Sequence, residues 1–554
     1  MEAIIPAKQY EMLELGFIGP EPAGSQVQVD LCGRFTRGER TWTVPGFYAG
    51  NGTYRLRFLP EEAGEYGLTV TGSILDAPQT AKVVSAAAAA GRHGPVRAEG
   101  THLRHADGAW FHGFGTTVYA MAHQSRALME ETFQSLENGP FNKIRMCVFP
   151  KHYVYNTNNP EFYPFQVKEG REEKSFDAAG LPLFPIEQPE RDSYWDVHMP
   201  SYDFWDAFED KLRRMEKLNI QVDLILFHPY DRWGFANLTQ EDNLVYLDYL
   251  LRRFSAFPHL WWSLANEYDL VAARSLADWH EIEEFVAAHD PYHHLLGNHQ
   301  CFLIYDPSRK NITHMSWQTK QLFRVGEMQR KYGKPVLIDE CRYEGNIPEF
   351  FGNLSGQDMT RSFWKVTTQG GYCTHGETYL PGTPEGDAAT ATGEQDVVWW
   401  ARGGILHGQS PARIGFLRGI IESLPGPLEP LGAGMSGILG MTDEEIRRSA
   451  VDLPEYLAPM LRTICSMERA ERDGFFAVEF EYNGHCGDDA FLRYLDDQCC
   501  ALTRMNLPEN HSYRVEVIDT WEMTRETVLE NASGLTEVRL PGKPWMAVLA
   551  VRTD

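Results

Sequence analysis

The chain has 554 residues, of which 43% are hydrophobic and 12% aromatic. This length exceeds what one ordinary core can organise and predicts about two to four domains. Its 51 basic and 77 acidic side chains give a formal net charge of -26 at pH 7, which disfavours nucleic acid and anionic membrane surfaces as partners.

The first residues, MEAIIPAKQYEMLEL, carry acidic side chains where a secretory signal has a basic region followed by an apolar run. No stretch reaches the roughly 20 apolar residues of a membrane span. The nine cysteines form no CxxC pair and are expected to be reduced, mostly buried side chains. We therefore expect a cytoplasmic protein without a membrane partner and without a thiolate metal site.

Residues 1–95 are predicted to form an N-terminal antiparallel β-sandwich. Apolar and polar residues alternate in SQVQVDLCGRF, TWTVPGFYAGNGTYRLRFLP and GEYGLTVTG. Gly50, Asn51 and Gly52 predict a tight turn between two of these strands. The following run, SAAAAAGRHGP, ends in glycine and proline and is the candidate linker to the next domain.

Residues 96–465 are predicted to form an α/β domain, a (β/α)8 TIM barrel. Short apolar runs alternate with amphipathic helical patterns, such as SYDFWDAFEDKLRRMEKLN, EDNLVYLDYLLRRFSAF and QLFRVGEMQRKYG. In such a barrel the site lies where the strands end. The eight predicted strands are FHGFGTT, FNKIRMCVF, QVDLILFHP, LWWSLANE, HHLLGNH, ITHMSWQ, PVLIDE and GGYCTHGE.

Two long insertions interrupt the barrel pattern, from Pro150 to Pro200 and from Tyr379 to Trp399. Loops of this length in a compact domain are typical of site walls. We expect both to border the site.

Residues 466–554 are predicted to form a second, C-terminal β-sandwich. Alternation returns in FFAVEFEY, AFLRYLDD, SYRVEVIDTWEM, TEVRLPG and WMAVLAV. Neither flanking sandwich shows an exposed aromatic platform, so both are expected to buttress the barrel or a subunit interface. Assembly into a homo-oligomer is compatible with the sequence.

The stretch WWSLANEYD begins as a buried strand and ends in groups that are costly to bury without partners. If LWWSLANE is the fourth barrel strand, Asn266 and Glu267 emerge at its C-terminal end. KPVLIDE, the seventh strand, ends in Glu340 in the same way. Two converging carboxyl groups are what hydrolysis of a glycosidic bond requires, one to protonate the leaving oxygen and one to attack the anomeric carbon.

In its motifs ANEYD and DECRYEGN the chain resembles the clan A retaining glycoside hydrolases. With GFYAGNGTYRLRFLP near the start and YRVEVIDTWEMT near the end, it resembles a glycosidase family with an N-terminal β-sandwich domain of formerly unknown function, a barrel and a C-terminal β-domain. The resemblance implies that Glu267 is the acid/base, that Asn266 binds the sugar 2-hydroxyl and that Glu340 is the nucleophile. This chemistry needs no metal and no organic cofactor.

Three further charged residues need an interpretation, one in an earlier strand and two within DECRYEGN. Arg145 in the strand KIRMCVF is expected to pair with the nucleophile and lower its pKa, with an ordinary buried ion pair as the alternative. Asp339 points away from Glu340 on an alternating strand and is interpreted as structural. Glu344 is an alternative nucleophile if that strand runs longer.

The remaining candidates are side chains at predicted strand ends that could line a sugar-binding cleft, with loop structure or packing as the alternative for each. The cluster HDPYHHLLGNH lacks ligand spacing, so no metal site is expected there. The predicted cleft residues are His228, Asp231, His299, Trp317, His375, Glu377 and Trp400.

The sequence favours a retaining glycoside hydrolase, exo-acting on short β-linked oligosaccharides or glycosides. Galactosides, glucosides and pentosides, including arabinofuranosides and apiosides, remain open. Two alternatives are a carbohydrate-binding or scaffold protein without turnover, and a transglycosidase that uses the same carboxylates.

Overall fold

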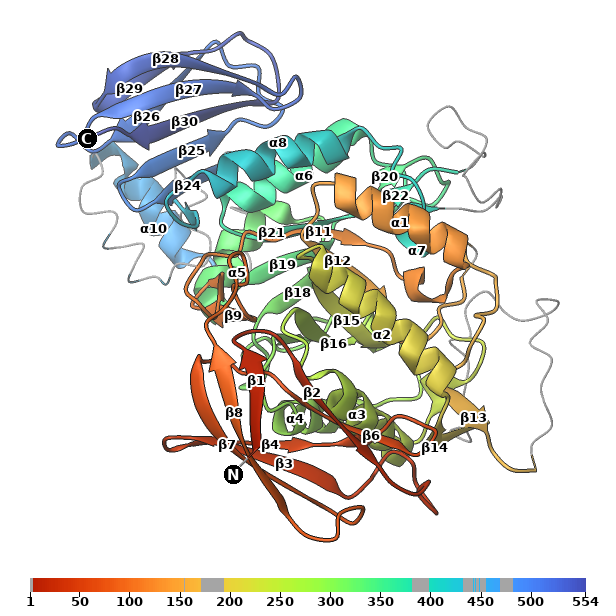
Figure 1. The fold of residues 1–554 in the computed structure, drawn as a ribbon. Helices are drawn as coiled ribbons and strands as arrows, with labels where there is room; N and C mark the ends of the chain where they lie inside the picture. Colours follow the sequence, from red (N-terminus) through yellow and green to blue (C-terminus); the bar gives the residue numbers. More distant parts are fainter. Residues whose placement is uncertain are drawn as a thin grey trace.

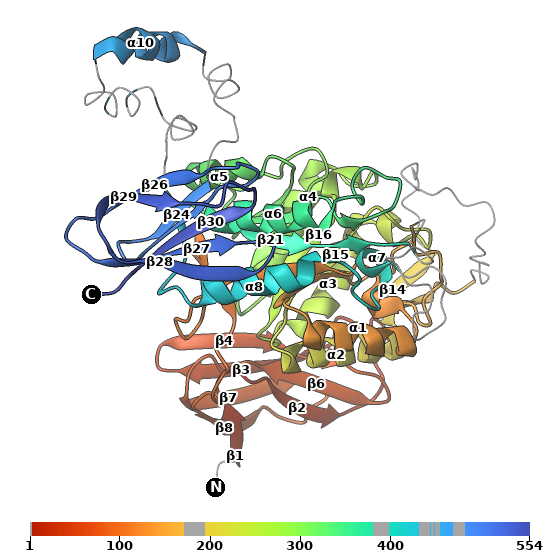
Figure 2. The same cartoon turned by 90° about the horizontal axis from the view of Figure 1, so that it is seen from above.

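The computed structural model describes residues 3–153, 155–170, 194–380, 398–431, 455–468 and 482–554, together with residues 442, 444 and 448. An α/β barrel lies at the centre, with one β-rich unit at each end of the chain (Figure 1). The two β-rich units lie on different sides of the barrel (Figures 1 and 2). Among the described helices, none combines the length and the apolar composition that a bilayer crossing requires.

Two sheets form the N-terminal sandwich, one with the order β1-β8-β7-β3-β4 and one with the order β2-β6-β5. Phe35, Leu56 and Tyr66 are fully buried in its core. The predicted turn is confirmed, because Thr53 N donates to Gly50 O at 2.9 Å. The strands are β1 (Ala3–Lys8), β2 (Leu13–Ile18), β3 (Leu31–Arg37), β4 (Arg40–Pro45), β5 (Phe47–Tyr48), β6 (Thr53–Phe58), β7 (Gly64–Gly72) and β8 (Gln79–Ala86).

One strand pair of this sandwich departs from the antiparallel prediction, since β1 and β8 run parallel. The chain passes from β1 to β2 in the other sheet, so no hairpin fixes the direction of β1 against its neighbour.

The predicted linker enters a hairpin formed by β9 (Val96–Glu99) and β10 (His102–His105). Leu103 of this hairpin packs in one buried cluster with Trp261 and Leu337, which lie near the starts of two barrel strands. The hairpin thereby covers the N-terminal end of the barrel and leaves the opposite end to the site.

Eight parallel strands in the order β17-β16-β15-β12-β11-β21-β19-β18 form the nearly closed barrel, which confirms the predicted fold class. Each predicted strand contains one observed strand, and β17 and β18 are the two edges. The strands are β11 (Phe114–Thr117), β12 (Lys143–Cys147), β15 (Gln221–Phe227), β16 (Leu260–Ala265), β17 (Leu296–Gly297), β18 (Met315–Gln318), β19 (Val336–Glu340) and β21 (Tyr372–His375).

Amphipathic helices cover the barrel, and their ends follow local capping rules. Ser275 and Asp278 form a capping box at the start of α4, and α5 ends at Gly333, whose φ of 63° places it in the left-handed region. The helices are α1 (Arg126–Asn138), α2 (Tyr202–Lys217), α3 (Gln240–Phe254), α4 (Leu276–His289), α5 (Val325–Tyr332), α6 (Gly356–Thr368), α7 (Trp399–Arg402) and α8 (Ser410–Glu422).

Short elements connect these units. In the first insertion, β13 (Phe165–Val167) pairs with β14 (Trp195–Pro200), whereas the rest of the predicted site walls, residues 171–193 and 381–397, lies outside the described residues. The other short elements are β20 (Glu344–Gly345), β22 (Glu377–Thr378), η1 (Met121–His123), η2 (Phe235–Asn237), η3 (Tyr268–Leu270), η4 (Leu322–Arg324), η6 (Glu455–Leu457) and α10 (Ala458–Ser466).

The C-terminal unit has a sheet with the order β23-β24-β25-β30-β27-β28 and a second sheet of β26 and β29. Asp496 anchors it to the barrel through ion pairs with Arg361 and Lys365 of α6. Most of the predicted strand FFAVEFEY lies outside the described residues. The strands are β23 (Glu429–Pro430), β24 (Tyr482–Cys486), β25 (Ala490–Tyr494), β26 (Leu502–Leu507), β27 (Tyr513–Asp519), β28 (Thr524–Ala532), β29 (Gly534–Arg539) and β30 (Met546–Arg552).

Candidate active site

Glu267 and Glu340 both lie at the C-terminal end of the barrel. Glu340 is the last residue of β19, and Glu267 follows β16 by two positions. The backbone of Glu267 is left-handed, with φ 52° and ψ 59°, a conformation that non-glycine residues rarely adopt and that clusters at functional sites. Its N–H donates to His299 Nδ1 at 3.3 Å, which holds the strained turn in place.

A chain of hydrogen-bonding groups joins the two carboxyl groups. The Tyr119 hydroxyl contacts the Glu340 carboxylate and lies 2.9 Å from Asn266 Oδ1. Asn266 Nδ2 in turn donates to Glu267 Oε2 at 3.4 Å. Because these residues follow β11, β16 and β19, the closure of the barrel brings together side chains that are 147 and 221 positions apart.

A second phenol, Tyr230, donates to Glu267 from the loop after β15. Burial raises the pKa of Tyr230 well above its usual value, and the neighbouring Glu267 charge raises it further. Burial and Glu340 raise the pKa of Tyr119 in the same way. Both phenols therefore stay protonated and act as hydrogen-bond donors to the carboxylates.

The pKa of Glu340 is raised to about 7, first by burial and then by the charge of Glu267. Arg145 Nη1 lies 3.9 Å from Glu340 Oε1, so the structure brings these two residues together. The guanidinium lowers the pKa of Glu340 as expected, but burial and Glu267 outweigh it. Arg145 therefore acts on this carboxyl in the expected direction, although the pKa of Glu340 stays raised overall. A role for Arg145 in the reaction stays a prediction.

Arg145 also belongs to a buried network inside the barrel. Lys143 Nζ lies 2.5 Å from Asp339 and 3.1 Å from Asp223, and Arg145 Nε lies 3.3 Å from Asp223. Burial opposes ionisation of Asp339, yet Lys143 and Arg145 lower the pKa of this carboxyl well below its usual range. The structure thus gives Asp339 the structural partners that its position on the strand indicated.

Lys151 contributes an ammonium group to the same end of the barrel. Its Nζ lies 3.7 Å from the centre of the Tyr119 ring and 4.3 Å from that of Tyr230. The side chain is buried, and burial lowers the pKa of its ammonium group. Contacts with ring faces stabilise such a cation without neutralising the carboxylates.

Two of the predicted cleft residues lie against this site. His299 accepts the Glu267 N–H, as described above, and Trp400 packs edge to face on Tyr119 with ring centres 6.0 Å apart. Trp400 also lies 5.5 Å from the Tyr343 ring. Trp317, by contrast, is a buried residue of β18 within the hydrophobic core.

His228 and Asp231 are buried in the loop after β15. His228 Nε2 lies 3.1 Å from Phe149 O, and Asp231 accepts the N–H groups of Trp233, Gly234 and Ala236. These bonds fix the loop that presents Tyr230. A direct contact of either residue with sugar stays a prediction.

His375 and Glu377 lie together with Glu344 in a separate buried cluster. The Glu344 carboxylate accepts the N–H groups of Gln409 and Ser410 at the start of α8. This orientation argues against Glu344 as the nucleophile. The structure therefore does not bring His375 and Glu377 to the Glu267 and Glu340 pair, and a role for them in binding sugar stays a prediction.

The phenols and the lysine of the site did not emerge from sequence reasoning. Tyr119, Tyr230, Tyr343 and Lys151 each follow a barrel strand by no more than four residues. Their position just beyond a strand end was the available signal, but it does not distinguish a site residue from a loop residue.

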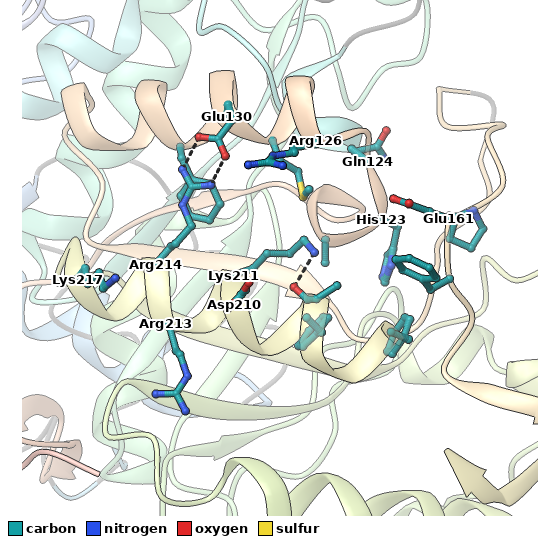
Figure 3. Close-up of a pocket in the computed structure, with 18 residues that line it drawn as sticks. His123, Gln124, Arg126, Glu130, Glu161, Asp210, Lys211, Arg213, Arg214 and Lys217 are labelled. Atoms are coloured by element: carbon teal, nitrogen blue, oxygen red, sulfur yellow. Dashed lines mark hydrogen bonds and ion pairs between the residues drawn. The ribbon is translucent and has the colours of Figure 1, made fainter. Parts of the chain in front are cut away.

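A pocket of about 590 Å³ lies on the outside of the barrel, between α1 and α2 (Figure 3). Arg214 pairs with Glu130 across it, and Lys211 donates to Ala207 O within α2. None of the predicted site residues lines this pocket.

The chain is similar to three families. Residues 97–381 match the apiosidase-like catalytic domain, residues 6–72 match a domain of unknown function, DUF5060, and residues 480–551 match another, DUF5605. No curated protein matches the chain.

Solved structures of similar architecture include two from Bacteroides vulgatus ATCC 8482. One, provisionally classed as a glycoside hydrolase, is 29% identical, covers 100% of both chains and has a TM-score of 0.78. The other, a glycoside hydrolase of family 5, is 14% identical with a TM-score of 0.55 and covers 83% of this chain and 93% of its own. A further glycoside hydrolase, 13% identical with a TM-score of 0.56, covers 83% of this chain and 97% of its own.

Proposed function

The chain belongs to the apiosidase-like family, and from that premise we propose that it is a retaining glycoside hydrolase with Glu340 as nucleophile and Glu267 as acid/base. The observation that carries this proposal is the chain of contacts from Glu340 through Tyr119 and Asn266 to Glu267. It places two carboxyl groups of different strands at one end of the barrel, as double displacement at an anomeric carbon requires.

In the first step, ionised Glu340 attacks the anomeric carbon while protonated Glu267 gives its proton to the departing glycosidic oxygen. The bond from the anomeric carbon to this oxygen breaks and an ester bond to Glu340 forms. The raised pKa of Glu340, caused first by burial and then by the Glu267 charge, fits a pair that binds one proton between them near neutral pH. Catalysis uses the form in which Glu267 holds that proton.

In the second step, Glu267 takes a proton from water as the water oxygen attacks the anomeric carbon. The ester bond breaks, Glu340 leaves as a carboxylate, and the sugar is released with its original configuration. Arg145 and Tyr119 stabilise the negative charge that returns to Glu340. Asn266 and Lys151 lie close enough to the pair to bind sugar hydroxyl groups.

For the substrate we propose a short β-linked glycoside, cleaved from its end. The name of the matched family directs the first choice toward apiosides, and arabinofuranosides are the next pentosides to test. Galactosides and glucosides follow. Tyr153, Tyr155 and Trp400 form an aromatic wall beside Lys151 that suits the apolar face of a sugar ring.

The test is a screen of aryl glycosides, covering both anomers of pyranosides and furanosides, with the wild type, Glu340→Ala and Glu267→Ala. One substrate is expected to turn over, and both substitutions are expected to remove most of the activity. Azide added to Glu267→Ala should give a glycosyl azide of retained configuration, because azide replaces the water of the second step.

The exposed residue Glu284 supplies the control, since Glu284→Ala removes a carboxylate of the same domain without touching the pair. A product of inverted configuration would overturn the retaining mechanism. Glycan binding without turnover of any substrate would favour the binding-protein alternative, and glycoside formation with added alcohol acceptors would favour the transglycosidase.

A further inference from the structure

Three side chains that the proposed reaction does not use converge in a closed cluster outside the catalytic pair. Glu344 of β20, His375 of β21 and Glu377 of β22 are 0%, 0% and 1% exposed. One ligand atom from each lies within 4.8 Å of the other two. The pairing of Glu344 with Glu377 in adjacent parallel strands fixes this convergence in the backbone.

Two atoms of the cluster have no hydrogen-bond partner among the described residues. These are His375 Nε2 and Glu377 Oε2, which lie 3.8 Å apart. Leaving a buried polar atom without a partner costs free energy. Among the described residues, no lysine or arginine forms an ion pair within 4.0 Å of Glu344 or Glu377.

The surroundings orient all three groups toward a common point. Backbone N–H groups of the segment that leads into α8 contact both carboxylates, with Gln409 and Ser410 donating to Glu344 and His407 donating to Glu377. The Tyr379 hydroxyl also donates to Glu344 Oε1, at 3.0 Å. Gly408 makes room for them, because a Cβ at this position would lie 2.6 Å from Oε2 of Glu344 and of Glu377.

The other ring nitrogen of His375 has a partner that suits a metal ligand. His375 Nδ1 lies 3.1 Å from Thr116 Oγ1, which also accepts a hydrogen bond from Trp399 Nε1 at 2.9 Å. If Nδ1 donates to this hydroxyl, the lone pair of Nε2 faces the cluster. Such a partner on the second nitrogen is typical of histidines that bind metal ions.

We propose that Glu344, His375 and Glu377 bind a divalent transition-metal ion, with Zn²⁺ as the first candidate. One imidazole and two carboxylates are ligands that Zn²⁺ accepts at about 2.0–2.2 Å. Ligands at this distance from one ion lie at most about 4.2 Å apart, so the cluster closes on it with small side-chain movements. The ion places a positive charge beside the two buried carboxylates.

This ion has a structural role that reaches the catalytic pair. Glu344 follows Tyr343 directly, and the Tyr343 hydroxyl lies 3.5 Å from that of Tyr119. An ion at Glu344 therefore ties the segment after the nucleophile Glu340 to β22 and to the start of α8. Loss of the ion is expected to lower thermal stability first and activity second.

The experiment uses the full chain, freed of metal with a chelator and then titrated with Zn²⁺, Mn²⁺, Ca²⁺ or Mg²⁺ alone. We expect one Zn²⁺ bound per chain by elemental analysis and a rise of several degrees in the thermal unfolding midpoint. Glu377→Gln should remove both effects. His93→Gln, which changes an exposed histidine paired with Asp107 at 2.7 Å, is the control and should keep both.

Crystals of the wild type soaked in Zn²⁺ provide a second test, because anomalous scattering locates the ion directly. This test does not depend on whether a variant folds. A peak between Glu344, His375 and Glu377 is expected. Failure of every metal to bind, or a bound ion that His93→Gln removes and Glu377→Gln retains, would overturn the proposal. Either result leaves the glycosidase proposal untouched, since that rests on Glu267 and Glu340.

Discussion

The barrel contains two sets of buried carboxylates whose partners differ. In its interior, Lys143 contacts Asp339 at 2.5 Å and Asp223 at 3.1 Å, and Arg145 lies 3.3 Å from Asp223 and 3.9 Å from Asp339. At its C-terminal end, Glu267 and Glu340 contact mainly the phenols Tyr230 and Tyr119, and Arg145 stays 3.9 Å from Glu340. Asp339 and Glu340 belong to different sets although they are neighbours in the sequence.

The difference distinguishes carboxylates with a structural role, in the interior, from the two carboxylates that we propose take part in the reaction. Burial opposes ionisation of Asp339, but Lys143 and Arg145 lower the pKa of this carboxyl well below its usual range, so it has no reason to exchange protons. At the C-terminal end of the barrel, neutral phenols hold Glu267 and Glu340 in position without placing an opposite charge beside them. Burial, and then the charge of Glu267, raise the pKa of Glu340 to about 7, so the charge of this carboxyl depends on its neighbour.

The largest expected effect is on activity, and it comes from substitution of a carboxylate at the C-terminal end of the barrel. Glu340→Gln should lower kcat by about 10⁴-fold or more, because an amide cannot form the covalent intermediate. Steady-state kinetics on the substrate found by the screen provide the measurement. Glu284→Gln is the control, and a wild-type rate in Glu340→Gln would remove this residue from the reaction.

The next largest effect is on stability, from the interior. Asp339→Asn should lower the free energy of unfolding by about 3–5 kcal/mol, because it leaves the buried cations Lys143 and Arg145 short of an anion. Urea denaturation measures this loss. The exposed Asp497, 3.5 Å from Arg361, is the matched control, and Asp497→Asn should cost no more than about 1 kcal/mol.

A third prediction concerns the pH dependence of stability. The folded protein raises the pKa of Glu340 to about 7, whereas a free glutamate titrates near about 4.3. Between these values the folded state binds more protons than the unfolded state, so this group lowers stability as pH rises toward 7. Above pH 7 this loss of folding stability no longer changes with pH.

Glu340→Gln removes this loss. At about 1.4 kcal/mol per pH unit, the variant should be more stable than the wild type by on the order of 3 kcal/mol at pH 8, and the difference should vanish near pH 4. Thermal midpoints across this range supply the test. A difference that does not change with pH would show that Glu340 titrates normally.

The smallest expected effect on activity comes from a residue that positions a carboxylate and does not react itself. Tyr119→Phe removes one hydroxyl from the carboxylate chain, and a hydrogen bond to a charged group contributes about 1.5–3 kcal/mol, so kcat should fall roughly 10- to 150-fold. Tyr246→Phe is the control, because its buried hydroxyl donates to the Leu226 carbonyl, at 3.2 Å, and to no carboxylate among the described residues. Similar losses in both variants would assign the effect to general packing.

Much of the fold could be predicted because hydrophobic periodicity is local. All eight barrel strands, the turn at Gly50 and the helix end at Gly333 lie where the sequence indicated. β28 could not be found in this way, because all of its residues except Ala532 are exposed and no alternation exists to detect. The parallel pairing of β1 with β8 depends on a neighbour that periodicity does not identify.

The sequence by itself determined that Glu267 and Glu340 follow barrel strands, since a strand's end and its polar residues are adjacent in the chain. Only the tertiary structure decided their partners. Tyr119 reaches a carboxylate 221 positions away, and His375 joins Glu344 and Glu377 rather than Glu267 and Glu340. Spacing along a strand fixes which face a residue occupies, whereas the closure of the barrel and the packing of its helices fix which distant residues share that face.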